Sequence, residues 1–132
     1  MGLKIKMEII TDLQKLKVVS QEVELNDLNK NKIRILALEM RETLLKNRGL
    51  GLSHVQVAEQ EPLQLFVFFD KGFNFRVIVN PKIIYKNNIT FCVKEGCLSL
   101  PKKEIYVCRP YKIRVRFYDE NFEKHEEEFR NI

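Results

Sequence analysis

The segment KEGCLSLP, Lys94 to Pro101, places a cysteine between a glycine and a leucine, directly after a glutamate. Gly96 allows a sharp bend and Pro101 ends the segment, so Cys97 is predicted to sit at a bend. Two interpretations fit this pattern. Cys97 is either a structural thiol in a tight turn or a thiolate that binds a metal ion. In the second case the main-chain N–H of Leu98 points into the same pocket, where it stabilises a developing oxyanion.

A second loop, GLGLSHVQ, runs from Gly49 to Gln56. Its two glycines either stop a helix or allow the backbone to approach a ligand closely and to adopt positive φ. A phosphate-binding loop is excluded, because no Gly-Lys-Ser/Thr follows and no strand precedes it. The side-chain amide of Gln56 is a donor suited to an oxygen that becomes anionic during acyl transfer.

One strong helix is predicted between residues 26 and 49. Asp27 or Asn29 caps its start, and Lys46, Arg48 and Gly49 mark its end. Apolar residues at helical spacing form one stripe, which we assign to the core: Ile33, Leu36, Ala37, Met40 and Leu44.

After this helix the pattern changes to short runs rich in aromatic and β-branched residues. These runs predict strands at 63–69, 75–80, 82–87 and 89–94. Residues 111–118 alternate strictly, with Ile113, Val115 and Phe117 on one face and Lys112, Arg114 and Arg116 on the other. A turn and a polar returning strand over 122–129 follow. The order indicates an α+β fold.

The bulk properties describe one soluble globular domain over residues 1–132, with a net charge of +5. No secretory signal and no apolar run long enough to cross a bilayer is recognisable. The chain has three cysteines, an odd number, and Cys92 and Cys108 are interpreted as buried thiols. These features predict a reducing, cytoplasmic location. A nucleic-acid binder is disfavoured, since basic and aromatic residues do not alternate on a defined face.

The two loops together resemble the peptide deformylase family. The shared features are Gly-x-Gly-Leu-x-x-x-Gln at 49–56 and Glu-Gly-Cys-Leu-Ser at 95–99, with VIVNP at 77–81 and VCRP at 107–110 as similar connecting segments. The resemblance implies an N-terminal helix packed on mixed or antiparallel β-sheets. It also implies a metal-dependent hydrolase that removes the formyl group from the N-terminal methionine of nascent proteins, usually with ferrous iron, and often with zinc or nickel after purification.

Carried over motif by motif, the resemblance assigns roles to particular positions. Cys97 is the expected metal ligand, and Gln56 and the N–H of Leu98 are expected to stabilise the oxyanion. The backbone of Leu50 and Gly51 is expected to receive the formyl-methionyl peptide in extended form, by β-strand addition. Glu95 is expected to be a structural carboxylate of the loop.

The sequence departs from the family pattern in two places. The family carries His-Glu-x-x-His on a C-terminal helix, whereas this sequence has no such motif, and HEEEF at 125–129 ends in phenylalanine. Ser53 and His54 stand where the family usually has two alanines. His54 is expected to point away from the site or to plug the cavity, with ligation the minority alternative, and His125 is expected to be a solvated surface residue.

These departures leave activity open, because one thiolate cannot hold a catalytic metal. A C-terminal helix is expected to be absent, which leaves an apolar patch that a second copy or a partner chain covers. Proximity to the ribosome is a further expectation. The alternative function is a non-catalytic peptide-binding module or partner subunit with the same fold.

Overall fold

The computed structural model describes the backbone of residues 7–97 and 100–130, and their side chains except those of residues 93–106. Helices α1 (Leu13–Leu16) and α2 (Asp27–Lys46) come first, followed by β1 (Gly51–Ser53) and the 3₁₀ turn η1 (His54–Gln56). The remaining strands are β2 (Leu65–Phe69), β3 (Phe75–Lys86), β4 (Thr90–Cys97), β5 (Leu100–Pro110), β6 (Lys112–Tyr118) and β7 (Lys124–Arg130).

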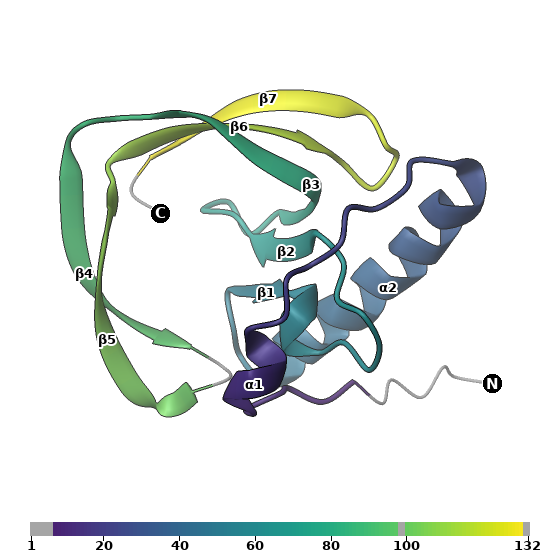
Figure 1. Ribbon diagram of the computed structural model, residues 1–132, viewed down its shortest axis with the longest axis horizontal. Coiled ribbons are helices and arrows are strands. Elements are labelled where there is room, and N and C mark those ends of the chain that lie inside the picture. The colour runs from purple at the N-terminus through teal and green to yellow at the C-terminus, as the bar shows by residue number, and fades with distance from the viewer. Residues whose placement is uncertain (1–6, 98–99, 131–132) are drawn as a thin grey trace.

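The strands form two sheets in which neighbouring strands are antiparallel. The larger sheet has the order β1-β2-β3-β6-β7, and β4 pairs only with β5 in a separate two-stranded ribbon. Figure 1 shows α2 on one side of the molecule and the β4–β5 ribbon on the other, with β3 and β6 curving between them. The α+β prediction is therefore confirmed, and no helix follows β7 within the described residues. Neither described helix is long and apolar enough to cross a membrane.

Helix α2 buries the apolar stripe predicted from the sequence, but its N-cap is a different residue from those predicted. Asn26, with an extended backbone (φ −136°, ψ 167°), caps the helix by accepting the N–H of Asn29 at 2.8 Å. The choice of Asp27 or Asn29 was wrong, because both residues already lie inside the first turn. At the other end the helix stops at Lys46, and Arg48 adopts a left-handed conformation (φ 55°).

The main core lies between α2 and one face of the larger sheet. Met40 and Leu44 of the helix are fully buried against alternate residues of the first three strands. Those sheet residues share one face because side chains alternate along a strand: Leu52, Leu65, Val67, Val77 and Val79.

Strand β3 is one 12-residue strand where the sequence indicated two. The interruption at Asn80-Pro81 is a bulge, with a register shift between Val79 and Lys82 against β6 and a φ of 51° at Asn80. The Asn80 side chain accepts the N–H of Val23 at 2.7 Å and donates to its carbonyl at 2.8 Å. The segment before α2 is thereby tied to the sheet.

The opposite face of the sheet carries a second cluster, to which no residue of α2 belongs. Ile78, Val115 and Phe117 are buried there, and Phe66 is 37% exposed. We call this surface the open sheet face and define it by the side chains that the strand registers place together: Phe66, Phe68, Ile78, Ile83, Val115, Phe117 and Phe129. The predicted alternation of β6 is confirmed, and its basic face forms ion pairs with glutamates of β7.

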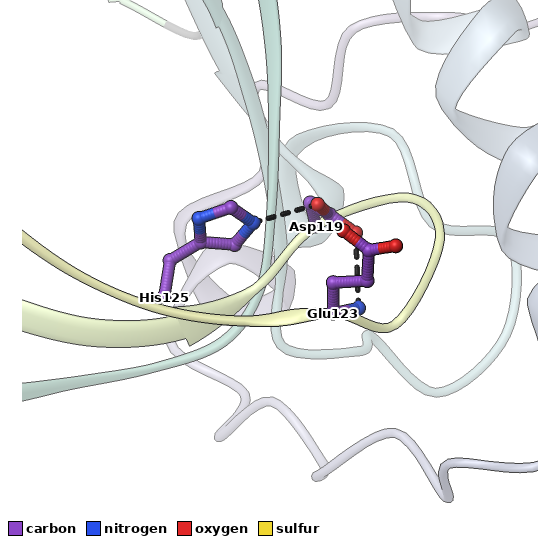
Figure 2. A group of neighbouring side chains, drawn as sticks. All are labelled: Asp119, Glu123 and His125. Carbon is purple, nitrogen blue, oxygen red and sulfur yellow. Dashed lines mark hydrogen bonds and ion pairs between the residues drawn. The ribbon is translucent and has the colours of Figure 1, made fainter.

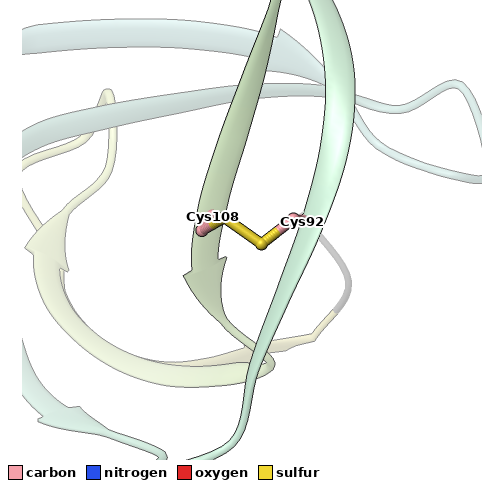
Figure 3. Close-up of a disulfide and its surroundings, with 2 residues drawn as sticks. All are labelled: Cys92 and Cys108. Carbon is pink, nitrogen blue, oxygen red and sulfur yellow. A yellow bond between two sulfur atoms is a disulfide. The ribbon is translucent and has the colours of Figure 1, made fainter.

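The prediction that Cys92 and Cys108 are buried thiols is wrong. Both are exposed, and they form a disulfide across the β4–β5 ribbon (Figure 3). The antiparallel register places them directly opposite each other, with a Cα–Cα distance of 4.0 Å. They are exposed because the ribbon forms its own sheet, away from the core beneath α2.

Candidate active site

Strand β1 is an edge of the larger sheet, and its backbone has one side turned away from β2. The carbonyl of Leu50 accepts the N–H of Phe69 at 3.0 Å, so it faces β2. Successive residues of a strand present their polar groups to opposite sides, so the N–H and C=O of Gly51 point to the open edge. Of the two residues expected to receive a peptide, Gly51 offers its backbone there, whereas the Leu50 carbonyl is engaged within the sheet.

Gln56 is held at this same edge by Ser53. The main-chain N–H of Ser53 donates to Gln56 Oε1 at 3.0 Å, and the main-chain carbonyl of Gln56 accepts the N–H of Ile10 at 2.7 Å. With Oε1 fixed as an acceptor, Nε2 is the donor end of the amide. Ser53 was not predicted as a site residue, although Ser-x-x-Gln is a sequence pattern of this capping arrangement.

The space beside Gly51 is limited by the ring of Phe66 in β2. A Cβ built on Gly51 lies 3.2 Å from Cζ of Phe66 and 3.3 Å from Cε2 of the same ring. A side chain at this position would therefore need the ring, which belongs to a residue 37% exposed, to shift by a few tenths of an ångström. No described glycine has positive φ, so the left-handed conformation suggested for the glycine loop is not used.

Cys97 is the last residue of β4, and its backbone pairs with Leu100 after a register irregularity at Gly96. Its side chain, that of Glu95 and the N–H of Leu98 lie outside the described residues. The roles expected of these three groups, and the convergence of Cys97 with Gln56, therefore stay predictions.

His54 is buried, with a residue exposure of 8%. Its Nδ1 accepts the N–H of Leu63 at 2.9 Å, which leaves the ring proton of the neutral form on Nε2. Desolvation by burial lowers the pKa of His54 below 6.5. The ring is thus a neutral structural group that ties η1 to the loop before β2.

His54 also lines a groove of about 790 Å³ beside α2, which Leu50, Gly51 and Gln56 do not line. The wall of this groove is acidic, with five glutamates and one lysine: Glu22, Glu24, Glu39, Glu59, Glu61 and Lys32. We place the candidate active site at the β1 edge and not in this groove, because the donor amide and the open backbone are at the edge.

One group of side chains in the described residues has the composition of a metal site. Asp119, Glu123 and His125 lie around the β6–β7 turn (Figure 2). Asp119 is already satisfied, because Oδ2 pairs with His125 Nε2 at 2.7 Å and Oδ1 accepts the N–H groups of Asn121 and Glu123. Partial burial raises the pKa of Asp119, but these hydrogen bonds outweigh it and the net shift is downward. The group holds the turn together.

The donor set of this chain does not fit a catalytic metal with three protein ligands. Cys97 is one candidate ligand, but His54 Nδ1 is engaged by the backbone and His125 is paired with Asp119 at the β6–β7 turn. His125 is exposed, at 42% of its side chain. No histidine pair is placed for the role that the family's His-Glu-x-x-His motif performs.

Comparisons with known proteins agree on one family. A sequence model described as polypeptide deformylase matches residues 7–132. The peptide deformylase of Bradyrhizobium diazoefficiens is 35% identical over 128 residues, which cover 91% of this chain and 71% of that protein. That of Afipia carboxidovorans is 39% identical over 102 residues, covering 74% of this chain and 58% of the relative.

Solved structures give the same result. Peptide deformylase from Thermotoga maritima superposes with a TM-score of 0.83 at 28% identity, covering 95% of this chain and 82% of that one. A class I type b peptide deformylase from Acinetobacter baumannii, in a crystal structure described as Met-Ala-Ser bound, has a TM-score of 0.83 at 25% identity. The coverage there is 94% of this chain and 83% of the other.

Proposed function

Since this chain belongs to the polypeptide deformylase family, we propose that it acts on the formylated N-terminus of nascent proteins. The substrate is a formyl-methionyl peptide, and the reaction is hydrolysis of the formyl amide. The observation that carries the proposal is the hydrogen bond from the Ser53 N–H to Gln56 Oε1, which makes Nε2 of Gln56 the donor at an open strand edge.

The peptide would bind by adding a strand to the free edge of β1. The outward N–H and C=O of Gly51 supply main-chain hydrogen bonds that do not depend on the peptide sequence. Such binding suits an enzyme that processes many different N-termini. Met-Ala-Ser, the tripeptide bound to the Acinetobacter baumannii deformylase, is a short peptide that begins with methionine, as the proposed substrate does.

Two groups would hold the formyl oxygen as its charge develops. Gln56 Nε2 is one donor and the main-chain N–H of Leu98 is the other. Preorganised donors of this kind contribute about 3–4 kcal/mol each to the stabilisation of a transition state. Cys97 would be one ligand of a ferrous iron, zinc or nickel ion. Such an ion, once its remaining ligands were supplied from outside this sequence, would supply an activated water.

In the family, the His-Glu-x-x-His motif supplies two histidine ligands and a glutamate base, and the 132 residues contain no such motif. We therefore propose that these groups come from outside this sequence, from a partner polypeptide or a further segment. The open sheet face is the surface that such a segment, a partner or a second copy would cover, because Phe66 is 37% exposed and Ile83 is 51% exposed there. Analytical ultracentrifugation tests whether a second copy covers this face. If the chain sediments as a monomer at micromolar concentration, that result counts against self-association.

The deciding experiment is a deformylation assay on formyl-Met-Ala with anaerobically purified chain and added Fe²⁺, Zn²⁺ or Ni²⁺. Release of formate above the buffer rate, lost in Cys97→Ser, supports the enzyme. No turnover under any of the three metals excludes the isolated chain as a deformylase.

A non-catalytic peptide-binding module is the second candidate. The open edge of β1 favours it, since strand addition needs no metal. Metal-free protein that binds formyl-Met-Ala-Ser, and keeps that binding in Cys97→Ser, would identify the module. In either case we propose a cytoplasmic location near the ribosome, where formylated chains are made.

A further inference from the structure

The β4–β5 ribbon carries an exposed disulfide near its base and Cys97 at its far end. Cys92 pairs with Cys108 two positions from the Thr90–Pro110 pair at which the ribbon begins. Cys97 ends β4 at the other extreme. Both bonded cysteines are exposed residues, and the bond joins the two strands of the ribbon (Figure 3).

The two strands of the ribbon pair at eight positions, from Thr90–Pro110 to Cys97–Leu100. The ribbon pairs with no third strand among the described residues, and the part of it whose side chains are described, residues 90–92 and 107–110, belongs to neither core cluster. Two-stranded ribbons are marginally stable on their own in water. A bond between two cysteines that are sixteen residues apart in sequence removes many open conformations from such a ribbon.

We propose that Cys92 and Cys108 form a redox-modification site, opened by low-molecular-weight thiols and closed by their disulfides, which controls the order of the ribbon that carries Cys97. In a thiol-rich compartment, disulfides are usually transient or redox-sensing, and exposed ones are the labile class. An effect of this site on activity rests on the proposed function, in which Cys97 is a metal ligand. The opening and closing of the disulfide does not depend on that function.

The exchange balances with a thiol such as glutathione. One thiolate attacks a sulfur of the Cys92–Cys108 bond, which gives a mixed disulfide and releases one protein thiolate that takes up a proton. A second glutathione thiolate attacks the glutathione sulfur of the mixed disulfide and releases the other protein thiolate, which also takes up a proton. The products are two protein thiols and one molecule of glutathione disulfide, so two electrons pass from the small thiols to the protein pair. The reverse reaction closes the bond.

The test uses the full chain in buffers that span ratios of reduced to oxidised glutathione. Alkylation with mass spectrometry counts free thiols, and hydrogen exchange reports the order of residues 90–97 and 100–110. We expect one free thiol in the oxidised form, since two of the three cysteines are bonded, and three in the reduced form. Reduction is expected to speed amide exchange in the ribbon by about tenfold to a hundredfold, with β2 and β3 unchanged.

The variants separate the possible causes. Cys108→Ser should exchange like the reduced chain at every ratio, and Cys97→Ser, the matched control, should switch like wild type. Resistance of the bond to reduction throughout the range, or failure of the pair to oxidise, would overturn the proposal. Equal ribbon exchange in both redox states would overturn it as well. Absence of deformylase turnover would leave these readouts intact, so failure of the proposed function is distinguishable from failure of the switch.

Discussion

The main-chain N–H of Ser53 and Oε1 of Gln56 are 3.0 Å apart, and this hydrogen bond sets which end of the glutamine amide donates. An amide that rotated freely would present either end to a substrate oxygen. The turn at η1 thus orients this amide before any peptide binds, as the proposed role of Gln56 in oxyanion stabilisation requires.

Two substitutions of Gln56 test the donor and the acceptor of its side-chain amide separately. Gln56→Glu keeps an oxygen for the Ser53 N–H but removes the donor, whereas Gln56→Leu removes both. We expect both variants to bind formyl-Met-Ala about tenfold more weakly, and only Gln56→Leu to lose about 1 kcal/mol of unfolding free energy. Fluorescence titration and urea unfolding measure the two effects, with the exposed neighbour Gln60→Leu as the control. Wild-type binding by Gln56→Glu would remove Gln56 from the site.

Acid should destabilise the fold through His54. The folded chain holds this ring neutral with a lowered pKa, while the unfolded chain takes up a proton near 6.5. The unfolded state therefore binds more protons below that pH, and the free energy of unfolding falls as the pH drops from about 7 to 5.

Urea unfolding at a series of pH values measures this slope in wild type and in His54→Ala. The variant should be less stable at pH 8 and should show a flatter dependence below 6.5. Thr43→Val is the control, because Thr43 is buried and hydrogen-bonded to the Glu39 carbonyl but does not titrate. An unchanged slope in His54→Ala would show that other groups carry the acid sensitivity.

Arg76 and Glu127 connect β3 to β7 across the intervening β6. Two hydrogen bonds, of 3.1 and 2.5 Å, join the guanidinium to the carboxylate, and the side chains are 27% and 36% exposed. The hydrogen bonds that Arg76 donates to Glu127 raise the pKa of Arg76. A double-mutant cycle with Arg76→Met and Glu127→Gln should give a coupling energy of about 1 kcal/mol.

The more exposed pair Arg116–Glu126 is the matched control for that cycle, since both of its side chains are 43% exposed. Its coupling should be smaller, about 0.2–0.5 kcal/mol, and should vanish in 1 M salt. Equal coupling in the two pairs would mean that the two-point geometry of Arg76 adds nothing.

Alanine substitutions of the two leucines at the end of α2 should differ sharply in the unfolding free energy that they cost. Leu44 is fully buried and Leu45 is 49% exposed, although both belong to the same turn. We expect Leu44→Ala to cost about 2–5 kcal/mol of unfolding free energy and Leu45→Ala less than about 1 kcal/mol. Thermal and urea unfolding compare the two, and similar losses would contradict the placement of the core on one face of the helix.

Much of the fold was predictable because its signals are local. The stripe of α2 and the alternation of β6 arise from the geometry of one element, so Met40, Leu44, Val115 and Phe117 were assigned correctly. The family followed from two short motifs whose residues are close together in the sequence. Helix caps depend on backbone angles just outside the helix, and for that reason Asn26 was missed.

The amino-acid sequence by itself determined the long helix, most of the strands, the family and the absence of a His-Glu-x-x-His motif, since each is written in neighbouring residues. Only the tertiary structure decided that Cys92 bonds to Cys108, that His54 is held by the Leu63 backbone, and that Ser53 orients Gln56 at a sheet edge. Strand register and burial are set by contacts between distant segments, and these contacts determine which potential ligands and donors are already engaged.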